Sequence, residues 1–171
     1  MPVIQVAIEN PDAPAWLPTP NIIVRKCRSR AKDKISGFEE HSPNGSESVW
    51  IKHGSEVDLG EARTQKYIAD IVNSDEKCIV RVPQVYCAFW HNEVGYLVME
   101  YVPGRDCNDD DLEAVISAVQ RLWAIESPTN APGPVGGGLI VHCFFPDSWA
   151  CIEYDSIEAL QDHVNRACPP S

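Results

Sequence analysis

The chain has 171 residues and a mass of 19.0 kDa, a usual size for one domain with a hydrophobic core. Its formal net charge is -11, which argues against a nucleic-acid partner, because nucleic-acid binders normally present a basic face. No stretch approaches the roughly 20 apolar residues of a membrane-spanning helix, and no basic residues precede the short apolar run at the start. We therefore expect a cytoplasmic protein with reduced cysteines that binds neither nucleic acid nor membranes.

Residues 1–20 are rich in proline, which argues against a regular helix and predicts an arm or edge segment laid on a surface. Asn21–Val24 is predicted to form a strand because it contains consecutive β-branched residues. The basic block at 25–34 follows. We interpret this block as a solvated face in preference to a phosphate-binding site, because charged runs are usually solvated.

A second predicted strand, Ser48–Lys52, follows the turn residues at 41–46. Successive side chains of a strand point to opposite faces, so Val49 and Ile51 share one face while Trp50 and Lys52 share the other. A helix is predicted next, over residues 59–72, with Asp58 as its N-cap. The pattern thus places Lys52 at the end of a strand that leads directly into a capped helix.

Glu61 lies in the first turn of that helix, and two interpretations are open. It can complete a capping box with Asp58, because it occupies the third helical position. Alternatively, it pairs with Lys52, because helical spacing puts it on the same stripe as the apolar residues Ile68 and Val72. A carboxylate beside a buried stripe needs a cationic partner, and Lys52 is the nearest candidate in the chain. We favour the Lys52–Glu61 pair.

Residues 79–90 are strand-like but interrupted by Pro83, and the turn residues at 91–95 predict an antiparallel hairpin with the next strand. That strand is Tyr96–Gly104, which ends at a Pro-Gly pair. Pro103 cannot donate to a ladder, so the last residues should leave the sheet as an extended connector. Free backbone N–H and C=O groups of such a connector can pair with a flat heterocycle.

These motifs resemble the small N-terminal lobe of protein-kinase-like enzymes. Val49-Trp50-Ile51-Lys52 is similar to the Val-Ala-Ile-Lys signature of kinases. Stretches such as Arg81-Val-Pro and Val98–Gly104 make the resemblance closest to fungal proteins of the aminoglycoside-phosphotransferase-like family. The resemblance implies an α+β fold, with a mainly antiparallel sheet packed by one helix. It further implies a proline-rich arm at 1–20, an N-lobe at 21–105 ending in the hinge, and an incomplete, mostly helical start of the large lobe at 106–171.

The resemblance also implies a nucleotide site. Lys52 would contact the α- and β-phosphates of ATP and pair with Glu61. The Glu100 carbonyl and the Val102 amide would meet adenine, with Met99 at the back of the pocket. The Gly-rich hairpin that covers the phosphates in kinases is matched only weakly, by Ser36-Gly-Phe38 and Asn44-Gly45. Magnesium would accompany ATP weakly or not at all, because its ligands lie on loops that have no counterpart here.

The C-terminal part is predicted to be mainly helical. Residues 109–125 form the clearest helix, whose three leading aspartates are interpreted as helix-start residues in preference to metal ligands. Its apolar stripe consists of Leu112, Val115, Ile116, Val119, Leu122 and Trp123. A Gly-rich loop at 129–138 lacks the ending of a P-loop. We expect a short strand at 139–145 containing a structural His142, and a capping box Asp155–Glu158 that opens a helix over 156–167.

No catalytic or metal-binding residues are predicted, because neither a His-x-Asp…Asn arrangement nor an Asp-Phe-Gly or Asp-x-Asp motif occurs after His142. We expect no turnover by this chain alone. Three interpretations are open: an incomplete copy of a phosphotransferase, a non-catalytic nucleotide-binding or interaction module of pseudokinase type, and a structural α+β domain. The apolar faces of the two C-terminal helices must fold back on the lobe, meet a protein partner or drive self-association.

Overall fold

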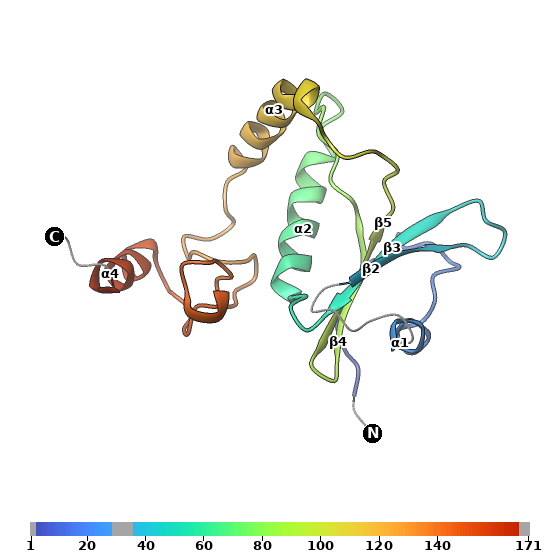
Figure 1. Cartoon of the computed structure of the whole chain (residues 1–171), viewed down its shortest axis with the longest axis horizontal. Helices are drawn as coiled ribbons and strands as arrows, with labels where there is room; N and C mark the ends of the chain where they lie inside the picture. Colours follow the sequence, from blue (N-terminus) through green and yellow to red (C-terminus); the bar gives the residue numbers. More distant parts are fainter. Residues whose placement is uncertain (1–2, 29–35, 168–171) are drawn as a thin grey trace. The chain divides into compact units, whose positions relative to one another are not determined.

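The computed structural model describes residues 3–28 and 36–167 and shows an α+β protein (Figure 1). The described residues form one open, five-stranded antiparallel sheet and four α-helices. The chain divides into two compact units, Met1–Ala124 and Ile125–Ser171, which are taken separately below. Residues 29–34 of the basic block lie outside the described residues. No helix in the described ranges is long and apolar enough to cross a membrane.

The sheet lies in the first unit and has the strand order β1-β4-β5-β3-β2. The strand bounds are β1 Gln5–Glu9, β2 Ser36–His41, β3 Ser48–Gly54, β4 Val85–His91 and β5 Val94–Glu100. The predicted hairpin is confirmed: β4 and β5 pair antiparallel across Asn92 and Glu93, whose φ values of 51° and 61° fit a two-residue turn with left-handed backbone. The proline-rich arm contains β1, which is an edge strand paired with β4.

The predicted strand at Asn21–Val24 is wrong, because these residues belong to α1, Pro20–Arg28. Pro20 occupies the first helical position, where its missing N–H costs nothing, and the amides of Ile22 and Ile23 donate to the Thr19 carbonyl. Ile23, Val24 and Cys27 are buried, at a spacing that a helix places on one face. Packing of this face overrides the strand preference of the β-branched residues.

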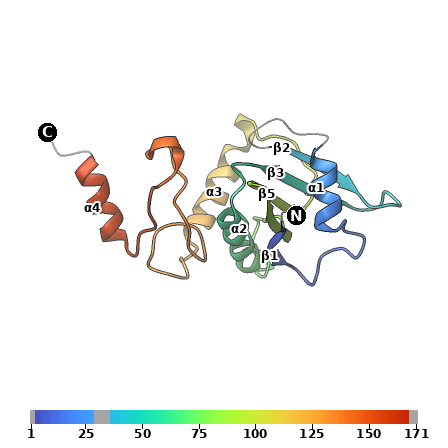
Figure 2. The same cartoon turned by 90° about the horizontal axis from the view of Figure 1, so that it is seen from below.

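Helices cover both faces of the sheet, where the sequence predicted only one helix (Figure 2). On one face, Ile23 of α1 packs with Val49 and Ile51 of β3. On the other face, Ala62 of α2 packs with Leu97 and Met99 of β5, and Trp50 packs against this second cluster. The predicted alternation along β3 is thus confirmed. The α2 face is the one on which Lys52 and Trp50 lie.

The second helix, α2, runs from Leu59 to Val72, with the predicted bounds. Asp58 caps it by accepting a hydrogen bond of 2.9 Å from the Gly60 amide. The side chain of Glu61 does not serve as the second half of a capping box; it bonds Lys52 instead. Of the two interpretations of Glu61, the pair with Lys52 is therefore the one that forms, because the fold brings the end of β3 next to the first turn of α2.

The predicted helix after the connector is present as a 3-10 turn, Asp109–Asp111, continued by α3, Leu112–Trp123. Asn108 caps the turn and forms a capping box with Asp111. Asp111 also accepts two hydrogen bonds from the Arg105 guanidinium, at 2.7 and 3.0 Å, which lower its pKa. Asp111 thus has the helix-start role that the sequence predicted for the three leading aspartates.

The second unit contains a short 3-10 turn, Pro146–Ser148, and α4, Ile157–Ala167. Phe145, Ala150 and Tyr154 form its small core. The expected strand at 139–145 is wrong: a single bridge joins Val141 to Trp149, and the segment is otherwise irregular. The Nδ1 atom of His142 accepts a hydrogen bond of 3.1 Å from the Phe144 amide, which is a local structural contact.

The expected cap of the last helix is displaced by one residue. The Ser156 hydroxyl, and not Asp155, accepts a hydrogen bond of 3.2 Å from the Ala159 amide. Serine and aspartate are both good N-caps, so the sequence left two adjacent candidates for the same position.

Candidate functional site

The predicted ion pair between β3 and α2 is present. The Lys52 Nζ atom lies 2.5 Å from the Glu61 Oε1 atom. The two side chains are 24% and 38% exposed, so the pair lies at the rim of the α2 face and remains accessible to solvent. An ammonium group in this position can contact an anionic ligand while the carboxylate holds it in place.

The register of the sheet shows what lies beside this pair. Lys52 is opposite Leu97, and Trp50 is opposite Met99, so these four side chains point to the same face. Lys52 and Trp50 are two residues apart on β3, which corresponds to roughly 7 Å along an extended strand. The ion pair and the end of β5 are therefore neighbours on one surface.

A hollow of about 520 Å³ lies where the chain leaves β5. Its walls include Trp50, Pro83, Met99, Glu100, Tyr101 and Val102. Residues from Tyr101 onward are outside the sheet, as the sequence predicted for an extended connector. Three of the predicted site residues, Met99, Glu100 and Val102, thus line one hollow. The other two, Lys52 and Glu61, are paired with each other next to it and do not line it.

Aromatic side chains that the sequence did not predict as site residues form one side of the hollow. The rings of Trp50 and Tyr101 are near parallel, at an interplanar angle of 23° and a centroid distance of 6.4 Å. The indole of Trp50 covers Gly37 of β2 so closely that a Cβ atom there would lie 2.6 Å from its Cζ2 atom. The signal was the alternation along β3, which puts a large aromatic side chain on the same face as Lys52.

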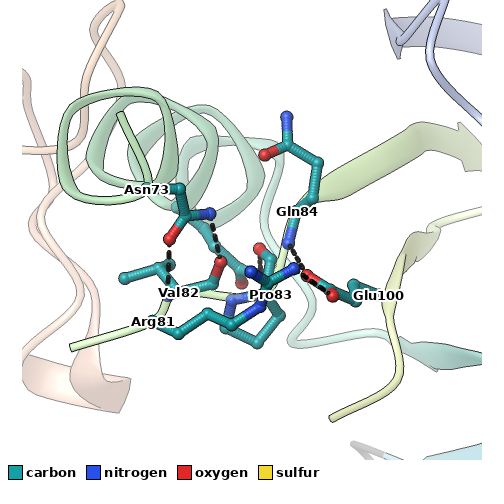
Figure 3. Close-up of polar contacts among 7 residues, drawn as sticks. Asn73, Arg81, Val82, Pro83, Gln84 and Glu100 are labelled. Atoms are coloured by element: carbon teal, nitrogen blue, oxygen red, sulfur yellow. Dashed lines mark hydrogen bonds and ion pairs between the residues drawn. The ribbon is translucent and has the colours of Figure 1, made fainter. Parts of the chain in front are cut away.

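Residues 81–84, which precede β4, bind Glu100 at the end of β5 (Figure 3). The Arg81 guanidinium contacts the Glu100 Oε1 atom at 2.5 Å, and this hydrogen bond raises the pKa of Arg81. The Gln84 amide donates to the Glu100 Oε2 atom at 3.3 Å, and the Glu100 amide donates to the Gln84 carbonyl at 2.8 Å. The sequence predicted a backbone role for Glu100 and missed this role of its side chain.

These contacts have a consequence for the backbone of the connector. In a regular antiparallel pair, two residues exchange both of their N–H···O=C bonds. Here the Gln84 amide is bonded to the Glu100 carboxylate instead of the Glu100 carbonyl. The carboxylate thus substitutes for the carbonyl at the last rung of the sheet.

Within residues 3–28 and 36–167, no group of three or more His, Cys, Asp or Glu side chains is placed to hold a metal ion. The chain matches no protein-family model, and neither the curated proteins nor the solved structures include one that is similar to it.

Proposed function

We propose that this chain provides the ATP-binding lobe of a small-molecule phosphotransferase of the kinase-like, aminoglycoside-phosphotransferase-like type. The single observation that carries the proposal is the Lys52–Glu61 ion pair, formed on the same face as a hollow that the connector borders. A paired lysine beside a sheet, followed by an extended connector, provides a cation for phosphates and a backbone edge for a base.

Each part of a nucleotide has a suitable counterpart at this site. In the proposed complex, the Lys52 ammonium contacts the phosphates, and Glu61 holds that ammonium in position. The base lies in the hollow, where the Glu100 carbonyl and the Val102 amide pair with its edge and Met99 lies behind it. The indole of Trp50 offers an apolar aromatic surface between the two, and stacking on such a surface is favourable for any base.

The proposed lobe binds nucleotide without completing phosphoryl transfer. Transfer requires a residue that orients the acceptor hydroxyl and carboxylates that hold magnesium, and the predicted site contains neither. We therefore propose weak binding of ATP, little dependence on magnesium and no turnover by this chain alone. We also propose that it acts in the cytoplasm, in keeping with its free thiols.

Isothermal titration calorimetry with ATP, with and without magnesium, tests the proposal. We expect saturable binding by the wild-type protein and at least a tenfold loss in Lys52→Met, because one charged hydrogen bond contributes about 1.5–3 kcal/mol. The matched control is Lys66→Met, which removes an exposed lysine of α2 that pairs with Asp70 at 2.7 Å. Its affinity for ATP should equal that of the wild type.

Two results would overturn the proposal. One is an absence of binding by a folded wild-type protein at millimolar ATP. The other is equal affinity of Lys52→Met and the wild type, which would show that the ion pair has only a structural role. A coupled assay with magnesium-ATP and a panel of alcohols and aminoglycosides tests the absence of turnover. Activity that Lys52→Ala abolishes would contradict it.

A second candidate function is that of a non-catalytic interaction module. The observation that favours it is the apolar stripe of α3, where Leu112, Ile116 and Trp123 are 60%, 47% and 83% exposed. Contiguous apolar patches are uncommon on monomers and mark interaction surfaces. A protein partner or a second copy that covers this stripe would be compatible with nucleotide binding at the other site.

A further inference from the structure

The residues Arg81–Gln84 cross from α2 to the connector, and we call this segment the strap. We infer that the strap is a positioning device: it couples α2, which carries Glu61, to Glu100, the last residue of β5, from which the connector starts. The importance of this coupling for ligand binding rests on the proposed function, but the coupling itself can be measured without a ligand.

The strap is irregular, and side chains bond the amide and carbonyl of Val82, the carbonyl of Pro83 and the amide of Gln84. Pro83 has no N–H and interrupts the strand pattern, so the ladder does not continue past the Gln84–Glu100 pair. Outside a ladder, backbone groups are paired with side chains or water, and the strap uses side chains even where it is exposed to solvent. The Asn73 side chain bonds both backbone groups of Val82: its Oδ1 atom accepts from the amide at 3.1 Å, and its Nδ2 atom donates to the carbonyl at 2.8 Å. Figure 3 shows this two-sided contact.

The next backbone groups of the strap are bound in the same way. The Gln65 Nε2 atom donates to the Pro83 carbonyl at 2.9 Å and lies 3.4 Å from the Met99 Sδ atom. The Gln84 amide and carbonyl both face Glu100, the first bound to its carboxylate and the second to its amide. Along three consecutive residues, the partners thus change from α2 to the connector.

This change of partners makes the strap a mechanical link. Gln65 lies in α2, and Asn73 is the C-cap of this helix about two turns further on, so the helix holds the strap at two points. A shift of α2 therefore displaces Val82 and Pro83, and through Gln84 it displaces the groups that bind Glu100. Because Glu61 is on the same helix, the ion pair and the connector are coupled through contiguous hydrogen bonds. Gln65 and Asn73 are positioning residues, which act on the connector without touching a ligand.

Residue-resolved amide hydrogen exchange of Asn73→Ala tests the coupling. Two net hydrogen bonds of about 0.5–1.5 kcal/mol each are lost, so exchange at Val82 should increase roughly tenfold or more. The decisive amide is that of Glu100, which makes no contact with Asn73. If the strap transmits the change, exchange at Glu100 also increases severalfold, while Phe38 and Ile51 on β2 and β3 keep their wild-type rates.

Asn44→Ala is the matched control. The Asn44 Oδ1 atom accepts hydrogen bonds from the Ser46 amide and hydroxyl, at 3.2 and 2.8 Å, in the β2–β3 loop. This variant loses the same kind of side-chain bond elsewhere and should leave exchange at Glu100 unchanged. Asn73→Asp keeps an acceptor for the Val82 amide and loses the donor. It should give an intermediate rate at Glu100, and it serves as the test variant if Asn73→Ala does not fold.

Two outcomes would overturn the inference. In one, exchange increases at Val82 but not at Glu100, so the strap is local. In the other, exchange increases equally at Phe38, Ile51 and Glu100, so Asn73 acts only on global stability. A parallel ATP titration separates this inference from the proposed function. Wild-type protein that binds no ATP refutes the proposed function while the exchange result stands, and ATP binding with uncoupled exchange refutes the strap alone.

Discussion

Lys52 and Glu61 are nine residues apart in the sequence, and their side chains meet at 2.5 Å between the end of β3 and the first turn of α2. Both side chains are partly exposed, so solvent screens their attraction. The position of the pair is fixed by two elements that pack for other reasons: β3 through Val49 and Ile51, and α2 through Ala62. The ion pair is therefore a consequence of the fold more than a cause of it.

The first prediction is that Glu61→Gln lowers the free energy of unfolding by less than about 1 kcal/mol, as is usual for exposed ion pairs. Urea unfolding measures this change. Asp70→Asn, which breaks the exposed pair with Lys66, is the control and should give a similar value. A loss of about 3 kcal/mol or more would indicate instead a buried bridge on which the fold depends.

The second prediction concerns the close approach of Gly37 and Trp50. In Gly37→Ala the new Cβ atom would lie 2.6 Å from the indole, so the ring or β2 has to move, at a cost of roughly 1–3 kcal/mol. In the Trp50→Leu background this cost should vanish, and a double-mutant cycle measures the difference. Gly104→Ala is the control, because a Cβ atom there would meet no atom within 4 Å. Additive effects of the two substitutions would contradict the contact.

The third prediction concerns pH. His53 is 2% exposed between Phe38 and Tyr96, and burial lowers its pKa below the ordinary value of 6.5. Below pH 6.5 the unfolded chain binds a proton that folded His53 resists. Stability is therefore full above this pH and decreases on acidification, by at most about 1.4 kcal/mol per pH unit for one proton.

Urea unfolding at pH 7 and pH 5 measures this effect. In His53→Phe the difference in unfolding free energy between the two pH values should be smaller than in the wild type. His142→Gln, which removes an exposed histidine of the second unit, should keep the wild-type difference. An unchanged difference in His53→Phe would show that His53 does not contribute to the acid sensitivity.

The fourth prediction concerns thiol reactivity. Cys87 is 6% exposed, and burial raises its pKa to about 11, so it is almost entirely protonated at pH 8. Cys107, Cys143 and Cys151 are exposed. Because the thiolate is the reactive form, a disulfide reagent at pH 8 should modify these three before Cys87. Peptide mapping by mass spectrometry gives the order, and early modification of Cys87 would indicate that β4 opens readily.

The fifth prediction concerns the α3 stripe. Ile116→Glu places a charge on the exposed apolar face and should reduce the binding of a hydrophobic dye, with little change in melting temperature. Gln120→Glu is the control, because it adds the same charge to an exposed polar position of the same helix. If the two variants bind as much dye as the wild type, the stripe is covered in solution by the second unit or by another chain. Sedimentation velocity distinguishes these two states.

The elements that the sequence predicted well are those whose signals are local. The alternation at Val49–Lys52, the cap at Asp58 and the turn at Asn92 each depend on residues a few positions apart. The ion pair was predictable because Lys52 and Glu61 each had an independent reason for their position. These signals describe neighbours in the chain, and they say little about which face of the sheet a distant segment covers.

The features that the sequence did not predict depend on contacts between distant segments. Asn21–Val24 favours a strand locally, and it is a helix because Ile23 and Cys27 pack on β-strands that come later in the chain. In the strap, side chains of Asn73 and Glu100 replace the hydrogen bonds of a backbone ladder. No pattern in residues 79–84 predicts that these two residues are the partners. The role of Trp50 in the hollow depends on Gly37, which reaches it only through the pairing of β2 with β3.

The pairing of Gln5 with Trp90 joins the first strand of the chain to β4, so the sheet can be completed only late in folding. During synthesis, β4 and β5 can form their hairpin as soon as both strands are made, whereas β1 must wait for a partner that lies about 80 residues downstream. Closing so long a loop is slow, so the first strand should dock last. A shortened form that lacks residues 3–10 would leave the backbone N–H and C=O groups along the outer edge of β4 unpaired. Unpaired strand edges promote aggregation between chains.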